Sequence, residues 1–148
     1  MATGTVKFFE EAMATMINGG WEAADDIKVA ICDNTTVPAV GTATPALGDF
    51  TQVGSAGTYV AGGTSIGTLS AVVTEAAGTV LFDSTTNPTW AQDASNDVDA
   101  YWAIIYNDTD AGNAALAFVE LGGPRDMTAG SLTITWHVTS GFATMVQA

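Results

Sequence analysis

Three apolar segments separated by turn residues constrain the fold of this chain more than any other feature. They are residues 100–107, 115–121 and 131–138. Each has the length of a β-strand and is rich in branched or aromatic side chains. In the last segment Leu132, Ile134 and Trp136 alternate with threonine and histidine, as in a strand with one buried face. Clusters of Asp, Asn, Gly and Pro at 108–113 and 122–126 predict turns between them.

The rest of the chain adds short strands and one helix. Further strands are predicted at residues 27–32, 68–74, 78–83 and 142–146. Val6, Phe9 and Met13 recur at helical spacing and Asn18-Gly19-Gly20 is a stop signal, so a helix is predicted over residues 5–17. We therefore expect an all-β fold, an antiparallel β-sandwich of jelly-roll or Ig-like type with one N-terminal helix. Residues 1–20 form a helix or arm packed on a sandwich domain of residues 21–148.

The inward faces of these strands define a predicted core. Its members are Ile27, Val29, Ile31, Leu81, Ile104, Phe118, Leu132, Ile134 and Trp136. At 148 residues the chain has the size of one ordinary domain, which folds without disulfides or metals.

The charge balance limits the classes of partner. Three Lys and Arg residues stand against 16 acids, which gives a net charge of −13. Nucleic acids and anionic membranes would be repelled, since binding to both depends on clustered cations. The N-terminal residues do not have the sequence pattern of a signal peptide, and no apolar run is long enough to span a membrane. We therefore expect synthesis in the cytoplasm, with neither nucleic acid nor membrane as partner.

The residues needed for catalysis are scarce. His137 is the one histidine and Cys32 the one cysteine, and the sequence holds no phosphate-binding loop. Two Cys or His residues are too few for a zinc site. We expect a protein that is not an enzyme and that uses no cofactor or metal.

Acidic loops and aromatic residues leave two binding alternatives open. Asp108, Asp110 and Asn113 resemble a calcium loop in composition, although the spacing fails at Gly112 and Val119. A second acidic loop contains Asp93, Asn96, Asp97 and Asp99. The four tryptophans are candidates for a sugar-binding face, and Tyr59 and Trp90 are the candidates to be exposed there.

The segment of residues 33–67 is the candidate interaction surface. It is rich in Gly, Thr, Ser and Ala, lacks Lys, Arg and His, and has only Asp33 and Asp49 as acids. Charge depletion distinguishes the buried centre of an interface from ordinary surface. Its apolar residues are the predicted contact residues: Val37, Val40, Leu47, Phe50, Val53, Tyr59, Val60 and Ile66. The N-terminal helix is the second candidate.

A series of motifs resembles a family of small virion proteins of tailed bacteriophages. They are Asp26-Ile-Lys-Val-Ala-Ile31, Gly57-Thr-Tyr-Val-Ala-Gly-Gly63, Phe82-Asp83 with Thr89-Trp90-Ala91, Tyr101-Trp-Ala-Ile-Ile-Tyr-Asn-Asp108, and Thr128-Ala-Gly-Ser-Leu-Thr-Ile-Thr-Trp136. The resemblance spans nearly the whole chain, and the chain departs from it at Cys32 and Pro38-Ala39.

This resemblance implies a capsid decoration (cement) protein. Such a protein binds the outside of a phage head, with the major capsid protein and copies of itself as partners, as a homotrimer on the capsid surface of the virion. The alternatives are a carbohydrate- or host-binding module displayed on the particle and a tail or neck component.

Overall fold

The protein is an all-β molecule with little helix. The computed structural model describes residues 4–76, 78–84, 86–137, 141 and 143–146. Strands make up 38% of the structure and helices 11%, and the paired strands are antiparallel. The expected β-sandwich type of fold is therefore confirmed.

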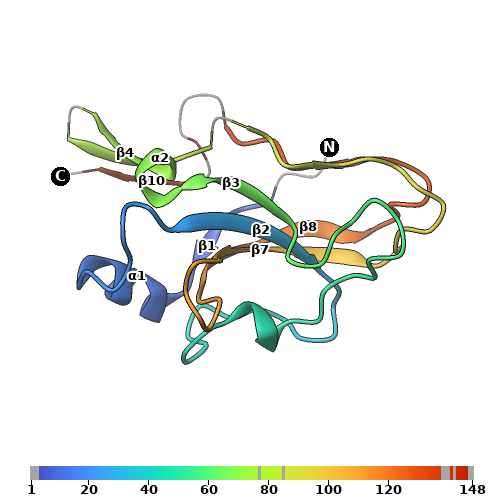
Figure 1. The fold of residues 1–148 in the computed structure, drawn as a ribbon, viewed down its shortest axis with the longest axis horizontal. Coiled ribbons are helices and arrows are strands. Elements are labelled where there is room, and N and C mark those ends of the chain that lie inside the picture. The colour runs from blue at the N-terminus through green and yellow to red at the C-terminus, as the bar shows by residue number, and fades with distance from the viewer. Residues whose placement is uncertain (1–3, 77, 85, 138–140, 142, 147–148) are drawn as a thin grey trace.

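In the described part of the chain, thirteen helices and strands follow one another (Figure 1). They are β1 (Lys7–Phe8), α1 (Glu10–Ile17), β2 (Asp26–Cys32), the 3-10 helix η1 (Leu47–Asp49), β3 (Thr64–Thr68), α2 (Leu69–Val72), β4 (Val73–Ala76), β5 (Thr79–Phe82), β6 (Thr89–Trp90), β7 (Ala100–Asn107), β8 (Ala115–Arg125), β9 (Leu132–Thr133) and β10 (Ala143–Val146).

These strands form one large sheet and two small ones. The five-stranded sheet has the order β1-β8-β7-β2-β3, the three-stranded sheet has the order β10-β5-β4, and β6 pairs with β9. In Figure 1 the small sheets lie above the five-stranded sheet, while α1 and the loop that carries η1 lie below it. The five-stranded sheet is thus covered on both of its faces.

Coverage on both faces explains the burial of the central strands. Every side chain of β7 except the half-buried Tyr101 is buried. Ala30, Ile104 and Phe118 lie in register on adjacent strands and so share one face of the sheet. Phe8 lies on the opposite face, and its ring contacts Phe82 of the three-stranded sheet with 5.0 Å between centroids. This contact joins the two sheets.

The strands at the centre of the sheet are confirmed. The predicted strand at residues 100–107 corresponds to β7, that at 27–32 corresponds to β2, and that at 115–121 is the first part of the longer β8. The predicted strand at 78–83 is β5, and the final one at 142–146 is β10 over its described residues, with Phe142 outside them.

The expectation of one long strand at residues 131–138 is wrong. Only Leu132–Thr133 forms a ladder, because its partner β6 is itself two residues long. Beyond it the backbone N–H of Ile134 donates to the carbonyl of Pro88, and that of Trp136 donates to Oδ1 of Asn87. Val138 lies outside the described residues. The alternation still placed Ile134 and Trp136 in the core, where they are 9% and 7% exposed.

Two helix boundaries differ from the sequence expectation. The N-terminal helix begins at Glu10 and not at residue 5, because Lys7–Phe8 pairs with β8 as a short edge strand. Part of the strand predicted at 68–74 is the helix α2, since Leu69 and Val72 bury their side chains at a spacing of three residues. The fold thus has a second, short helix besides the expected one.

The predicted core is confirmed at seven of its nine positions. Leu81 and Leu132 are only half-buried. Leu81 belongs to the three-stranded sheet, and Leu132 belongs to the sheet formed by β6 and β9. The other seven are buried, including Ile27, Val29 and Ile31, which have no exposed surface.

Candidate interaction surface

The segment of residues 33–67 is fastened to the sheet through Tyr59. Its hydroxyl accepts a hydrogen bond from the backbone N–H of Ile31 at 3.1 Å and donates one to Oε1 of Gln52 at 2.8 Å. The same Gln52 oxygen accepts a bond from the N–H of Gly62. Burial raises the pKa of the Tyr59 hydroxyl above its ordinary value, so the group stays protonated as a donor. The buried Tyr59 side chain thus links the segment to β2 and also links two parts of the segment to each other.

Asn96 holds the same segment from the other side. Its Oδ1 accepts hydrogen bonds from the backbone N–H groups of Thr58 at 2.8 Å and Tyr59 at 3.3 Å. Its Nδ2 donates to the carbonyls of Ala91 at 2.9 Å and Met127 at 3.3 Å. An amide is the side chain that both donates and accepts in this way. The sequence placed Asn96 in an acidic loop and gave no signal of this role, which depends on contacts between residues more than 30 positions apart.

Five of the eight predicted contact residues are buried in the chain's own core. They are Leu47, Phe50, Val53, Tyr59 and Ile66, each at most 5% exposed. Phe50, for example, stacks on Phe9 with 5.9 Å between ring centroids. The expectation that these five side chains are free to anchor in another subunit is corrected, because they are packed in the hydrophobic core of the chain itself.

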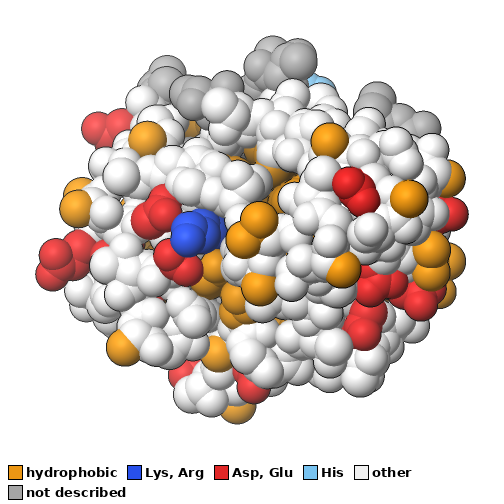
Figure 2. Space-filling view, turned by 45° about the vertical axis from the view of Figure 1, so that its right-hand side comes forward, with side chains coloured by type: hydrophobic (Ala, Val, Ile, Leu, Met, Phe, Trp, Pro, Cys, Tyr) orange, Lys and Arg blue, Asp and Glu red, His pale blue; other side chains and the backbone are white. Residues whose placement is uncertain are grey.

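The other three predicted contact residues are exposed. Val37, Val40 and Val60 are 60%, 43% and 67% exposed, and we call them the valine surface. The carbonyl of Val40 accepts a hydrogen bond from the N–H of Glu10, so this part of the segment lies against the start of α1. Figure 2 shows one face of the molecule, on which uncharged groups predominate and hydrophobic side chains occur in several places.

The aromatic side chains are not arranged as a sugar-binding face. All four tryptophans are at most 9% exposed. The rings of Tyr59 and Trp90 pack against each other in the interior with 6.1 Å between centroids, so neither is exposed as expected. Among the residues that the structure describes, no aromatic side chain is in the exposed class. A ring that stacks on a sugar needs one open face, and the buried rings of Tyr59 and the four tryptophans lack it.

Cys32 and His137 occupy different environments in the structure. Burial, together with the neighbouring Asp33, raises the pKa of the Cys32 thiol to about 12. The reactive thiolate is therefore scarce at neutral pH. His137 is exposed, and its backbone exchanges hydrogen bonds with Gly141.

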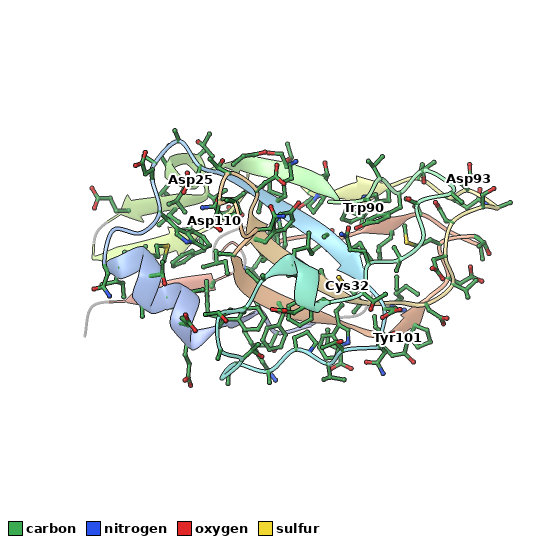
Figure 3. All side chains as sticks on the ribbon, turned by 60° about the horizontal axis from the view of Figure 1, so that its bottom comes forward. Asp25, Cys32, Trp90, Asp93, Tyr101 and Asp110 are labelled. Atoms are coloured by element: carbon green, nitrogen blue, oxygen red, sulfur yellow. The ribbon has the colours of Figure 1, made fainter. Side chains whose placement is uncertain are left out.

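The acidic side chains are spread over the molecule. Figure 3 shows Asp93 at the opposite end from Asp25 and Asp110. Asp108 pairs with the Lys28 ammonium at 2.6 Å, which holds the pKa of that carboxyl below its ordinary value. The backbone N–H of Gly54 does the same for Asp97. Within the described ranges, no group of three or more His, Cys, Asp or Glu side chains is placed to hold a metal ion.

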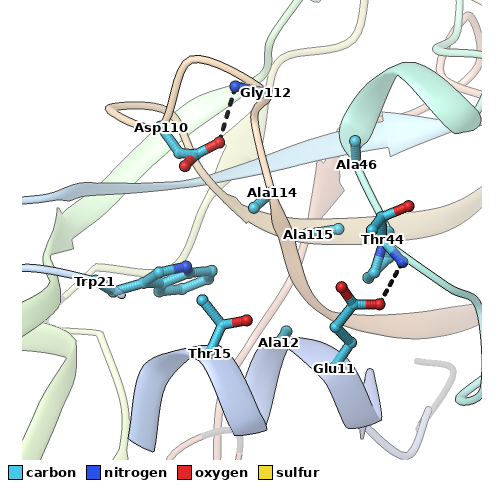
Figure 4. A pocket seen from close by; sticks show the side chains of 11 residues that line it. Glu11, Ala12, Thr15, Trp21, Thr44, Ala46, Asp110, Gly112, Ala114 and Ala115 are labelled. Carbon is cyan, nitrogen blue, oxygen red and sulfur yellow. Dashed lines mark hydrogen bonds between the residues drawn. The ribbon is translucent and has the colours of Figure 1, made fainter. Parts of the chain in front are cut away.

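A small cavity lies beside the N-terminal helix. Its volume is about 220 Å³, and α1, the loop at residues 44–46 and the turn between β7 and β8 border it (Figure 4). Glu11 and Asp110 contribute carboxylates to its wall, and Trp21 contributes an indole ring. Sequence reasoning missed this cavity, because it joins residues about a hundred positions apart that share no motif.

Comparison with known proteins finds no match for this chain. No family model matches the chain, and neither a curated protein nor a solved structure matches it. None of the helices in the described residues is long and apolar enough to cross a membrane.

Proposed function

We propose that this chain is a structural virion protein, a decoration protein that binds the outside of a phage head and stabilises it without catalysing a reaction. The observation that carries the proposal is the construction of residues 33–67. The segment is nearly free of charge, is fastened to the sheet by buried side chains such as Tyr59, and still exposes Val37, Val40 and Val60.

Fastening the segment favours tight association. A loop that is already ordered loses little conformational entropy when a partner covers it. The two acids of the segment are also bonded within the chain: Asp33 accepts from the N–H of Thr35, and Asp49 accepts from the N–H of Ala46. Covering this surface therefore takes at most the two charges of Asp33 and Asp49 out of water.

The partners in this proposal are the major capsid protein and other copies of the chain. A net charge of −13 opposes association between copies unless a third surface supplies positive charge. A trimer at a symmetry axis of a shell buries the same patch three times. The expectation of a trimer and the assignment to a virus particle both rest on the family resemblance.

A tail or neck component is the second candidate, because the same segment would serve in any particle contact. The number of copies per particle distinguishes a head decoration protein from a tail or neck component. A sugar- or host-binding module is less well supported, since Tyr59 and Trp90 are buried.

The test is the copy number of this chain in purified particles of the virus that encodes it, measured by mass spectrometry against the major capsid protein. We expect hundreds of copies per particle. A handful of copies would indicate a tail position, and absence from the particle would refute the virion assignment.

Variants tie the particle contact to the valine surface. Val37→Asp and Val60→Asp, made together, should abolish co-sedimentation of the purified protein with heads that lack it. Val98→Asp and Met145→Asp, made together, are the matched control, because Val98 and Met145 are 47% and 40% exposed and lie outside residues 33–67. Equal loss of binding in the control would show that added charge alone, and not this surface, weakens the contact.

A further inference from the structure

The helix α1 ends in a turn that requires glycine. The backbone N–H of Gly20 donates to the carbonyl of Thr15 at 2.9 Å, and the N–H of Gly19 donates to that of Met16 at 3.2 Å. These two bonds form a Schellman motif, in which the residue after the helix cap has a left-handed conformation. Gly19 has a φ of 76°, which glycine adopts without strain. The way the helix ends thus places a glycine directly after its cap residue, Asn18.

An asparagine followed by glycine undergoes a characteristic reaction of its side-chain amide. The backbone nitrogen of the next residue attacks Cγ of the asparagine, and the amide nitrogen leaves as ammonia, taking with it the proton of the attacking N–H. The product is a cyclic succinimide, which water opens at either carbonyl carbon to give aspartate or isoaspartate. A side chain on the following residue hinders ring closure, and glycine has none.

The structure leaves the Asn18 amide open to this reaction. Asn18 is exposed, and its side chain makes no hydrogen bond within the described residues. A Cβ atom at Gly19 would meet nothing within 4 Å, so the space around the attacking nitrogen is open. The last turn of α1 also has no basic side chain that could hold the amide oxygen. Nothing in this part of the chain therefore restrains the reacting group.

The other five asparagines lack this combination. Hydrogen bonds hold the side-chain amide at four positions, which are Asn34, Asn87, Asn96 and Asn107. The fifth, Asn113, makes no side-chain hydrogen bond in the described structure, but it is half-buried and Ala114 follows it. The structure describes all six asparagines, and Asn18 is the one whose free, exposed amide precedes a glycine.

Ring closure requires only a local opening of the helix end. Asn18 has a ψ of 5°, and the Gly19 nitrogen reaches Cγ by rotation about this angle, which breaks the bond from Gly19 to Met16. At 3.2 Å that bond is at the long end of the ordinary range. The ends of helices open at a free energy near zero, because few other contacts are lost. The folded protein therefore reaches the reactive geometry without unfolding.

We propose that Asn18 is a site of spontaneous modification, at which the backbone nitrogen of Gly19 displaces ammonia and water completes the conversion to aspartate and isoaspartate. The new carboxylate lies at the C-terminal end of α1, where the helix dipole disfavours negative charge and no basic residue of the last turn compensates it. It also lies next to Ile17, which is 74% exposed. Conversion therefore loosens the end of α1 and adds charge beside an exposed apolar side chain. This inference is independent of the proposed function.

Peptide mapping of the aged protein tests the proposal. The folded chain is kept in mildly alkaline buffer made with H₂¹⁸O and is then digested with trypsin in ordinary water. Cleavage after Lys7 and Lys28 releases residues 8–28, in which Asn18 is the one asparagine. We expect this peptide to acquire one ¹⁸O atom at residue 18, because the water that opens the ring supplies it. Fragmentation by electron transfer then distinguishes isoaspartate from aspartate.

Two variants assign the label to the Asn18 amide. Asn18→Gln keeps an amide, but its longer side chain closes the corresponding ring less readily, so the ¹⁸O label in residues 8–28 should be lost. Asn113→Gln is the matched control, since it makes the same change at the other asparagine with a free side chain. It should leave the label at residue 18 unchanged. Asn18→Asp should elute from an anion exchanger together with the aged wild type.

Two results would overturn the proposal. In the first, residues 8–28 of the folded protein stay unlabelled, and conversion only in urea would then show that the closed turn of α1 protects Asn18. In the second, the label appears at Asn113 before Asn18, which would show that a free amide and a following glycine do not decide the site. Both measurements use the free chain, so failure of the particle experiments leaves them unaffected.

Discussion

The hydroxyl of Tyr59 accepts a hydrogen bond from the backbone N–H of Ile31 across a distance of 3.1 Å. The two residues are 28 positions apart, and the bond joins the irregular segment of residues 33–67 to the strand β2. Tyr59 is 1% exposed, so the segment is part of the core of the domain and not a free arm. Any contact that this segment makes with a partner uses the side chains left outside, and the large apolar ones among them are those of the valine surface.

Replacing Tyr59 by Phe should destabilise the protein by about 1–3 kcal/mol, because the buried N–H of Ile31 and Oε1 of Gln52 both lose a partner. The free energy of unfolding in urea measures the effect. Tyr101→Phe is the control, since the half-buried Tyr101 makes no hydroxyl hydrogen bond in the described structure, and its change should stay within about 0.5 kcal/mol. Equal effects in both variants would contradict the fastening role of Tyr59.

Gly63→Ala should be strongly destabilising, by more than about 2 kcal/mol. Gly63 has a φ of 71°, and a Cβ atom there would collide with the backbone of Val29 and Ala30. Gly41→Ala is the matched control because the space around Gly41 is open, and it should be neutral within about 0.5 kcal/mol. Thermal unfolding of both variants checks this, and a Gly63→Ala protein as stable as the control would rule out the close approach of the loop to β2.

Trp136→Ala should cost about 3–5 kcal/mol, as large-to-small changes in a core do. Trp136 is 7% exposed although it lies beyond the short strand β9, so its burial comes from packing and not from a ladder. Denaturant unfolding gives the value. A variant with unchanged stability would show that the inward face of residues 132–136 is assigned wrongly.

Stability should fall at alkaline pH through Cys32. The pKa of the thiol is raised from 9.0 to about 12 in the folded state, so between these values the unfolded chain has lost a proton that the folded chain keeps. The free energy of unfolding therefore decreases as pH rises, by roughly 1 kcal/mol between pH 8 and pH 10. Cys32→Ala should lack this component when both proteins are unfolded in urea at each pH. Parallel pH profiles for the two proteins would mean that the thiol ionises freely when folded.

Regular patterning was the part of the fold that the sequence could predict. Residues 100–107 have an unbroken apolar run between turn clusters, and they form β7 with the predicted bounds. Residues 5–9 have helical spacing, but pairing of Lys7–Phe8 with the edge of β8 prevailed over it. Tertiary contacts override local preference where a strand edge is available.

The candidate surface was harder to predict because isolated apolar residues in an irregular loop have no period. Phe50 and Val60 look alike in the sequence, yet the first packs on Phe9 and the second is 67% exposed. The small cavity was invisible for a related reason. The residues that border it come from α1 and from the turn between β7 and β8, which are far apart in the sequence.

Hydrogen exchange on the free protein and on the protein bound to phage heads tests the central claim, that residues 33–67 form the partner surface. The backbone N–H groups of Val37, Val40 and Val60 donate no hydrogen bond in the described structure, so they should exchange fast in the free protein. On heads we predict that protection rises most at these three positions, while β7 stays protected in both states. Unchanged fast exchange at the three valines, with new protection elsewhere on the surface, would contradict the account.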